Sequence, residues 1–283
     1  MIHPLRIAHR GASGTGLAPE NTLAALELAI QTGVDLIEID VRASADGQIV
    51  VIHDATLERT TDAQGAVQDL PLETIRRADA GGWFAPEFAG ERVPLLEEVL
   101  DLARHRAVVL IEIKAAFIAE RVLQIVEYTA AEDYVVLQAF SPRTVERVKR
   151  LSPATPAALL VGKLPTAPSR LRARRLARDV LQTGANTLAV WHATLTPPFF
   201  EEMRKRGLAV WAWTVDEEVA MRDLIEMGIQ GLISNYPDRL NRVLAEMEEE
   251  GLIQMPLGRH QRLKRSRWAR RRQIKRLRRY RGD

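Results

Sequence analysis

The run Asp35-Leu36-Ile37-Glu38-Ile39-Asp40-Val41 indicates how this chain is built. It is typical of a buried strand whose end carries two carboxylates at positions i and i+2, so that both project from one face. A second apolar run, residues 107–113, leads into Glu112-Ile113-Lys114, which again places two charged side chains at i and i+2. Short apolar runs separated by amphipathic stretches are typical of repeated strand–helix units.

Such units continue along most of the chain. Apolar runs predict eight strands, at residues 5–9, 35–41, 107–113, 134–139, 156–161, 186–191, 208–213 and 230–234. Helical patterns follow them at residues 21–32, 95–105, 117–130, 142–151, 168–183, 197–206, 216–227 and 237–250. Eight strands with eight helices predict a (β/α)8 TIM barrel, with Asn21 as the N-cap of the first helix. An open doubly wound sheet is the alternative, but no Gly-x-Gly-x-x-Gly follows the first strand.

Two segments do not fit the repeating unit. Residues 47–92 are too long for a simple strand–helix connection, so we expect a small insertion after the second strand, over the barrel mouth. Its strand-like 48–53 and its Gly- and aromatic-rich 81–90 support this. We therefore predict a barrel domain over residues 1–257 that includes this insertion. The second segment, residues 258–283, is predicted to be a separate basic C-terminal tail.

Composition narrows the class of protein. The chain has no cysteine, which excludes disulfides and thiolate metal sites. No apolar stretch approaches the roughly 20 residues that cross a bilayer. The first expected strand begins close to Met1, which leaves no room for a signal peptide, so we expect a cytoplasmic protein.

Positive charge is concentrated in the tail. Residues 258–283 contain thirteen Lys or Arg and one acidic residue, whereas the rest of the chain has 27 basic and 36 acidic side chains, a net charge of −9. Such a segment is often simply solvated, but it would also be attracted to an anionic membrane or to nucleic acid. We favour the membrane, which would make the protein peripheral to it.

The paired carboxylates are candidates for a metal site. Glu38 and Asp40 on one face repel each other unless a cation lies between them, and carboxylate oxygens suit Mg²⁺ or Ca²⁺. A structural ion pair or a solvated strand end is the alternative. Glu112 on the next strand favours the metal because it adds a third carboxylate, and Lys114 beside it could bind an anion.

Two histidines also follow apolar runs. His9-Arg10-Gly11 comes after the first strand, and His53-Asp54 follows Val50-Val51-Ile52. A single histidine at a strand end usually packs or forms a hydrogen bond. Two of them beside an acidic cluster suggest proton transfer, since histidine can both take and give a proton near neutral pH. Arg10 could present its planar fork to two oxygens of a phosphate.

These residues belong to a longer ordered series that resembles the glycerophosphodiester phosphodiesterase family, bacterial cytosolic type. The matching blocks are His9-Arg10-Gly11-Ala12, Pro19-Glu20-Asn21-Thr22, Glu38-Ile39-Asp40-Val41, Asp46-Gly47, the run from His53 to Thr61, Gly81-Gly82-Trp83-Phe84, the run from Val93 to Glu98, Glu112-Ile113-Lys114, Trp213-Thr214-Val215 and the run from Gly231 to Pro237. Departures are small: the family often has Asn at position 216 and Ser at 139, where this chain has Asp216 and Ala139.

The resemblance implies a barrel and a site. It implies metal ligation by Glu38, Asp40 and Glu112, with Lys114 contacting the phosphate. It implies that His9 and His53 are the general acid and base, in an order that the sequence leaves open. Trp213 is either barrel-core packing or an aromatic wall for a glycerol moiety, and Phe84 would be a lid contact. His192 and Asn235, at two further strand ends, could face the mouth, with Asn235 either binding substrate or capping its turn.

The implied activity is metal-dependent hydrolysis of a glycerophosphodiester to an alcohol and sn-glycerol 3-phosphate. A lysophospholipase D-like activity on single-chain lipids is the enzymatic alternative. A binding protein with an inactive barrel is a third possibility, which the presence of all the proposed site residues argues against.

Overall fold

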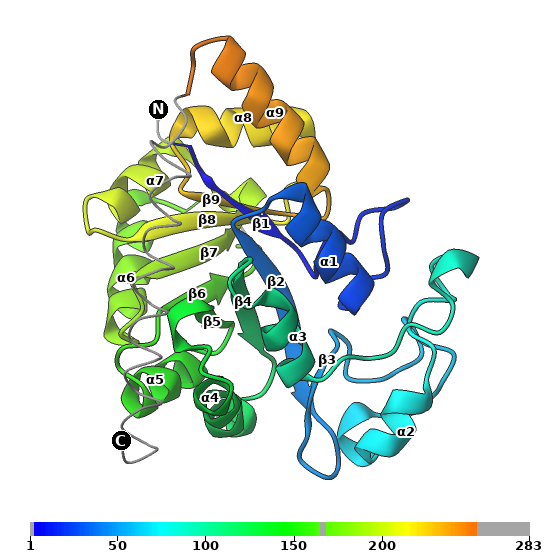
Figure 1. Ribbon diagram of the computed structural model, residues 1–283. Coiled ribbons are helices and arrows are strands. Elements are labelled where there is room, and N and C mark those ends of the chain that lie inside the picture. The colour runs from blue at the N-terminus through cyan, green and yellow to red at the C-terminus, as the bar shows by residue number, and fades with distance from the viewer. Residues whose placement is uncertain (1–2, 165–167, 254–283) are drawn as a thin grey trace, which may run out of the picture.

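Eight parallel strands close into a barrel in the computed structural model, which describes residues 3–164 and 168–253 (Figure 1). The strands are β1 (Leu5–Ala8), β2 (Leu36–Ala43), β4 (Val108–Ile113), β5 (Val135–Ala139), β6 (Ala157–Val161), β7 (Thr187–Trp191), β8 (Ala209–Trp213) and β9 (Gly231–Ser234). Their order is β1-β9-β8-β7-β6-β5-β4-β2, and β2 returns to β1 through the pair Ile7 and Leu36. The predicted TIM barrel is confirmed, and each strand lies within two residues of its expected range.

Helices surround the barrel and cover its outer face (Figure 1). They are α1 (Leu23–Thr32), α3 (Leu96–Ala103), α4 (Ala119–Tyr128), α5 (Pro142–Leu151), α6 (Arg170–Gln182), α7 (Pro197–Arg204), α8 (Glu218–Met227) and α9 (Pro237–Glu249). Short 3-10 turns lie at η3 (Ala116–Ile118), η4 (Glu132–Tyr134) and η5 (His192–Thr194). The barrel interior is filled by apolar side chains from alternate positions of the strands, among them Ile7, Leu110, Leu160 and Trp211. Successive side chains point to opposite faces, so residues two places beyond these reach the mouth.

The segment between β2 and α3 forms the expected insertion. Strand β3 (Ile49–Val51) pairs antiparallel with the end of β2, and the turns η1 (Val67–Asp69) and η2 (Pro86–Phe88) flank helix α2 (Leu72–Arg77). A small core of its own holds it together, built from Val50, Ile52, Leu57, Val67, Ile75, Ala80 and Val93. In Figure 1 the insertion, drawn in cyan, extends to one side of the barrel.

The turn between β1 and α1 differs from the expectation in one respect. Thr22, not Asn21, caps α1, and its side chain accepts a hydrogen bond of 3.3 Å from the N–H of Ala25. Asn21 has a φ of 59° and turns its side chain towards β2 instead. Gly11 makes the same turn close to the helix: its φ is +84°, and a Cβ there would lie 2.7 Å from the backbone carbon of Ala25. The sequence after His9-Arg10 thus packs directly on α1.

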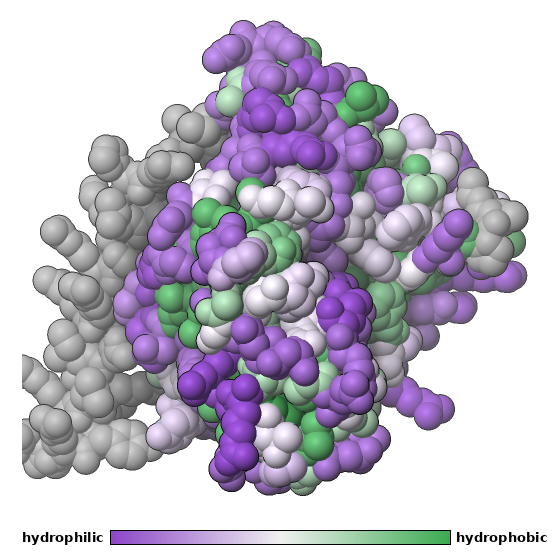
Figure 2. Space-filling model, turned by 90° about the vertical axis from the view of Figure 1, so that its right-hand side faces the viewer, coloured by the Kyte–Doolittle hydropathy of each residue, from purple (hydrophilic) through white to green (hydrophobic). Residues whose placement is uncertain are grey.

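Hydrophobic and hydrophilic residues are mixed on the face of the molecule shown in Figure 2. On the face shown in Figure 2, hydrophobic residues occur in small groups separated by hydrophilic ones. Within residues 3–164 and 168–253, no helix is long and apolar enough to cross a bilayer. The predicted basic tail at 258–283 lies outside the described residues.

Candidate active site

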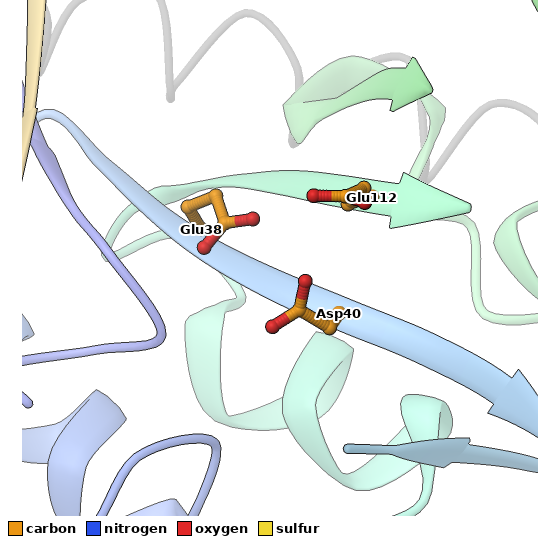
Figure 3. A group of neighbouring side chains, drawn as sticks. All are labelled: Glu38, Asp40 and Glu112. Carbon is orange, nitrogen blue, oxygen red and sulfur yellow. The ribbon is translucent and has the colours of Figure 1, made fainter. Parts of the chain in front are cut away.

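Three carboxylates converge inside the barrel at the carboxyl ends of β2 and β4 (Figure 3). Glu38 and Asp40 project from one face of β2, as their spacing predicted, and Asp40 is in register with Glu112 on β4. One oxygen of each lies within 4.8 Å of the others. All three are buried, with exposed fractions of 1%, 1% and 7%.

Two cations hold these carboxylates together. Lys114 Nζ lies 2.7 Å from Asp40 Oδ1 and 2.6 Å from Glu112 Oε1. Arg10 Nε lies 3.2 Å from Asp40 Oδ2, and the Arg10 backbone N–H donates to Glu38 Oε2 at 3.0 Å. Arg10 also has a φ of 55°, an uncommon conformation that points its amide and its side chain at the same cluster.

Burial and charge shift the three carboxyl groups in different directions. Burial, reinforced by the charges of Asp40 and Glu112, raises the pKa of Glu38. Burial and Asp40 likewise raise the pKa of Glu112. Burial also acts to raise the pKa of Asp40, but Lys114 and Arg10 outweigh it and hold that pKa below its usual range. Asp40 is therefore the carboxyl group of the cluster that stays ionised most readily. Glu38 and Glu112 need further positive charge nearby to stay ionised.

The cluster fits a hard divalent cation. Three carboxylates against Lys114 and Arg10 leave one net negative charge in a buried place, where it is costly. Gln138 on β5 pairs in register with Glu112 and donates from Nε2 to Glu38 Oε1 at 3.2 Å. Its own Oε1 is buried without a hydrogen-bond partner. Oxygen donors with unsatisfied charge are what Mg²⁺ or Ca²⁺ requires.

A second group of charges encloses the cluster. Glu20 forms two ion pairs: its Oε1 lies 2.8 Å from Arg10 Nη1, and its Oε2 lies 2.7 Å from Arg59 Nη1. Arg59 Nε in turn lies 2.6 Å from Asp54 Oδ2. The hydrogen bond from Arg59, opposed by burial and supported by His53, holds the pKa of Asp54 below its usual range. Asp54 and Arg59 thus connect the turn after His53 to Arg10 through Glu20.

The two histidines are each held through Nδ1. His9 Nδ1 lies 2.7 Å from Asn235 Oδ1, and His53 Nδ1 lies 2.6 Å from Asp54 Oδ1. Burial and the Arg10 charge lower the pKa of His9 to about 4. Burial also lowers the pKa of His53, against the opposing charge of Asp40. At neutral pH both rings favour the neutral form, and each keeps Nε2 for exchange of a proton with a ligand.

An aromatic group lies at the ends of β5, β7 and β8. The ring of Trp213 packs edge to face against two other rings. Its centroid lies 5.5 Å from that of Trp191 and 5.6 Å from that of Phe140. Trp213 packs on the barrel interior but stays partly exposed, and its Nε1 is buried without a partner. Trp213 therefore packs on the barrel core, and its role as an aromatic wall for the substrate stays a prediction. The ring of His192 meets that of Trp191 edge to face, with the ring centroids 5.1 Å apart, so His192 lies at this end of the barrel.

Phe84 does not join that group in the structure. Its ring packs against Trp83 and Phe88, both within the insertion. The ring centroids are 5.6 Å and 5.7 Å apart. A lid contact by Phe84 therefore stays a prediction.

Several residues near the site were not assigned to it by sequence reasoning. They are Glu20, Asn21, Gln138, Phe140 and Trp191. Asn21 Nδ2 donates to Asp40 Oδ2 at 2.9 Å, and the Asp40 backbone N–H donates to Asn21 Oδ1 at 3.2 Å. The one available signal was position: all five stand in a motif block or at the end of an expected strand.

The sequence of this chain matches a known protein family and several known proteins. Residues 9–239 match the model of the glycerophosphoryl diester phosphodiesterase family. The chain is 38% identical to YhdW of Bacillus subtilis (strain 168) over 236 residues, which cover 82% of this chain and 94% of that protein. It is 35% identical over 242 residues to a glycerophosphodiester phosphodiesterase of Caldanaerobacter subterraneus subsp. tengcongensis, covering 83% of this chain and 96% of the relative.

Solved structures show the same fold. A phosphodiesterase of Oleispira antarctica, determined in complex with the product sn-glycerol-3-phosphate, superposes with a TM-score of 0.76 at 27% sequence identity. The match covers 86% of this chain and 97% of that one.

Proposed function

Because the chain belongs to the glycerophosphoryl diester phosphodiesterase family, we propose that it hydrolyses glycerophosphodiesters to an alcohol and sn-glycerol 3-phosphate. The observation that carries this proposal is the convergence of three buried carboxylates, two cations and two histidines at one end of the barrel. In TIM barrels this end is where chemistry takes place. We include dependence on a divalent cation and catalysis by the two histidines in the proposal.

Glu38, Asp40 and Glu112 would hold the cation. When bound, it supplies positive charge that stabilises the phosphoryl oxygens and orients the attacking group. Arg10 and Lys114 would then turn towards the anionic phosphodiester, because a divalent ion takes over part of their pairing with Asp40 and Glu112. Trp213 would contact the apolar face of the glycerol or of the leaving alcohol.

The histidines would move the protons. One ring takes the proton from the attacking hydroxyl as its oxygen bonds to phosphorus. The phosphorus–oxygen bond to the alcohol then breaks with its electron pair on the alcohol oxygen, which receives a proton from the other ring. With the substrate's own glycerol hydroxyl as the attacker, this first step gives a cyclic phosphate. Water then opens it: the ring that lost its proton takes one from the water, and the ring that gained a proton gives it to the departing glycerol oxygen, which yields sn-glycerol 3-phosphate and returns both rings to their starting states.

Turnover of glycerophosphocholine tests the proposal. We expect release of choline and sn-glycerol 3-phosphate in the presence of Mg²⁺ or Ca²⁺, loss of activity with EDTA, and recovery when the cation is restored. The acylated substrate should be assayed beside it, since Phe140 at the mouth is 47% exposed and offers apolar surface to a single-chain lipid. Preference for the acylated form would favour the lysophospholipase D-like reading, and no turnover of either would leave an inactive binding barrel.

For the basic tail we propose attachment to an anionic membrane, which would place a cytoplasmic enzyme near its substrates. Thirteen cations in residues 258–283 would each contribute about 1 kcal/mol near such a surface. Removal of the residues after Leu257 should leave turnover of soluble substrate unchanged and abolish salt-sensitive binding to vesicles containing phosphatidylserine. Binding to RNA but not to vesicles would redirect the proposal to nucleic acid, and binding to neither at low salt would contradict it.

A further inference from the structure

A chain of hydrogen bonds connects Asp216 to His9 through Asn235. Asp216 follows β8, Asn235 follows β9 and His9 follows β1, and these three strands are neighbours in the barrel. Asn235 Nδ2 donates to Asp216 Oδ2 at 2.6 Å, and Asn235 Oδ1 lies 2.7 Å from His9 Nδ1. A carboxylate, an amide and an imidazole are thus connected by hydrogen bonds, although His9 and Asn235 are 226 residues apart in the sequence.

The carboxylate determines which way the amide faces. An ionised carboxylate has only acceptors, so Asn235 must turn its NH₂ group towards Asp216 and its carbonyl oxygen towards His9. The other oxygen, Asp216 Oδ1, accepts from Ser234 Oγ at 3.0 Å and from the Asn235 backbone N–H at 2.9 Å, which holds the carboxylate in place. Ser13 Oγ lies 3.1 Å from Asn235 Oδ1, but its one proton is also within reach of the His9 carbonyl oxygen at 2.7 Å, so the orientation of the amide rests on Asp216.

The amide in turn determines the tautomer of His9. A carbonyl oxygen accepts only, so the His9 nitrogen facing it must carry the proton. Burial and Arg10 lower the pKa of His9 to about 4, so the ring is neutral at pH 7 and has a single proton to place. We propose that Asp216 is a positioning residue which, through Asn235, holds His9 in the Nδ1–H form and keeps its Nε2 free to accept a proton.

This inference rests on the proposed function for its kinetic consequence. His9 would enter the reaction as the proton acceptor. His53 is held by the Asp54 carboxylate, which stabilises a protonated ring against the effect of burial, so His53 would be the donor in the fraction of molecules whose ring carries both protons. The structure thereby separates two histidines that the sequence leaves equivalent.

The variant Asp216→Asn reverses the constraint with almost no change in shape. An amide that keeps its oxygen towards Ser234 places its NH₂ group against that of Asn235, so Asn235 must flip and present its NH₂ to His9 Nδ1. The favoured tautomer then becomes Nε2–H. We expect kcat to fall by about 10²-fold, the low end for loss of a general base, because the imidazole itself remains. KM should change little, since Asp216 would act on the reaction only through Asn235 and His9.

A matched control is available in the insertion. Asp79 also accepts three N–H groups, from Gly81, Gly82 and Gly90, but has no described contact with His9 or Asn235. Asp79→Asn should leave kcat and the His9 tautomer unchanged. A loss of activity in both variants would indicate a general effect of the substitution and not the orientation of His9.

The decisive measurement is the ¹⁵N spectrum of the histidine rings in the full-length protein with Mg²⁺, with the His9 signals identified by their absence in His9→Gln. Wild type should show Nδ1–H at pH 7, and Asp216→Asn should show Nε2–H. A wild-type ring in the Nε2–H form overturns the inference even if the variant does not fold, and so does an unchanged tautomer in a folded variant. A protein without phosphodiesterase activity that still shows this tautomer change would refute the proposed function and leave the positioning role standing.

Discussion

Glu112→Gln is expected to lower turnover at low Mg²⁺ or Ca²⁺ by about 10²–10³-fold, which corresponds to the several kilocalories per mole that a catalytic cation contributes. The amide keeps the volume of the side chain but removes one of the three charges that would hold the ion. The fold should survive, because burial and Asp40 already raise the pKa of Glu112 and a neutral group suits that place. Without a cation, the melting temperature should be equal to that of wild type or higher.

The check has a readout that is independent of catalysis. A cation that binds only the folded state raises the melting temperature, and this rise should be lost in Glu112→Gln. Glu202→Gln is the matched control: Glu202 is also a buried carboxylate, at 1% exposed against 7% for Glu112, but it pairs with Arg174 and Arg206 far from the cluster. That control should keep both the cation-induced rise and the specific activity. If Glu112→Gln keeps them too, the three carboxylates are not the cation site.

His9→Ala and His53→Ala should each reduce turnover by about 10²–10⁴-fold, the range that a general acid or base contributes. Alanine leaves the attacking hydroxyl without an acceptor in one variant and the leaving oxygen without a donor in the other. His192→Ala is the control, because His192 lies at the same end of the barrel but packs on Trp191. It should retain activity within a few-fold.

A second substrate distinguishes the two roles. p-Nitrophenol leaves without a proton, so a p-nitrophenyl diester should restore the variant that lacks the acid and not the one that lacks the base. From the hydrogen bonds of Asn235 and Asp54, we expect that rescue in His53→Ala. Equal losses on both substrates in both variants would contradict this division of the proton transfers.

Local pattern was enough to predict the barrel. A parallel strand that is buried on both faces must be almost wholly apolar, so runs such as 107–113 and 156–161 stand out from the amphipathic helices between them. The shared face of Glu38 and Asp40 could also be predicted, because side chains two residues apart on a strand point to the same side. That Glu112 lies opposite Asp40 could not be predicted, because the register between two strands is not determined by either strand alone.

Local pattern failed where a long-range contact was stronger. Asn21 is a good helix cap, and a cap contributes about 1 kcal/mol. Its two hydrogen bonds with buried Asp40 are worth more, since a bond to a charged group contributes about 1.5–3 kcal/mol. Thr22 was adjacent and took over the cap at little cost.

The sequence by itself determined the barrel, the positions of its strands and the residue types at their ends, because burial and periodicity act within a few residues. Only the tertiary structure decided which of those side chains meet. Gln138 reaches Glu38 across 100 residues, Asn235 reaches His9 across 226, and Glu20 joins Arg10 to Arg59. Such contacts depend on strand order and register when the barrel closes, and these are properties of the whole chain rather than of any segment of it.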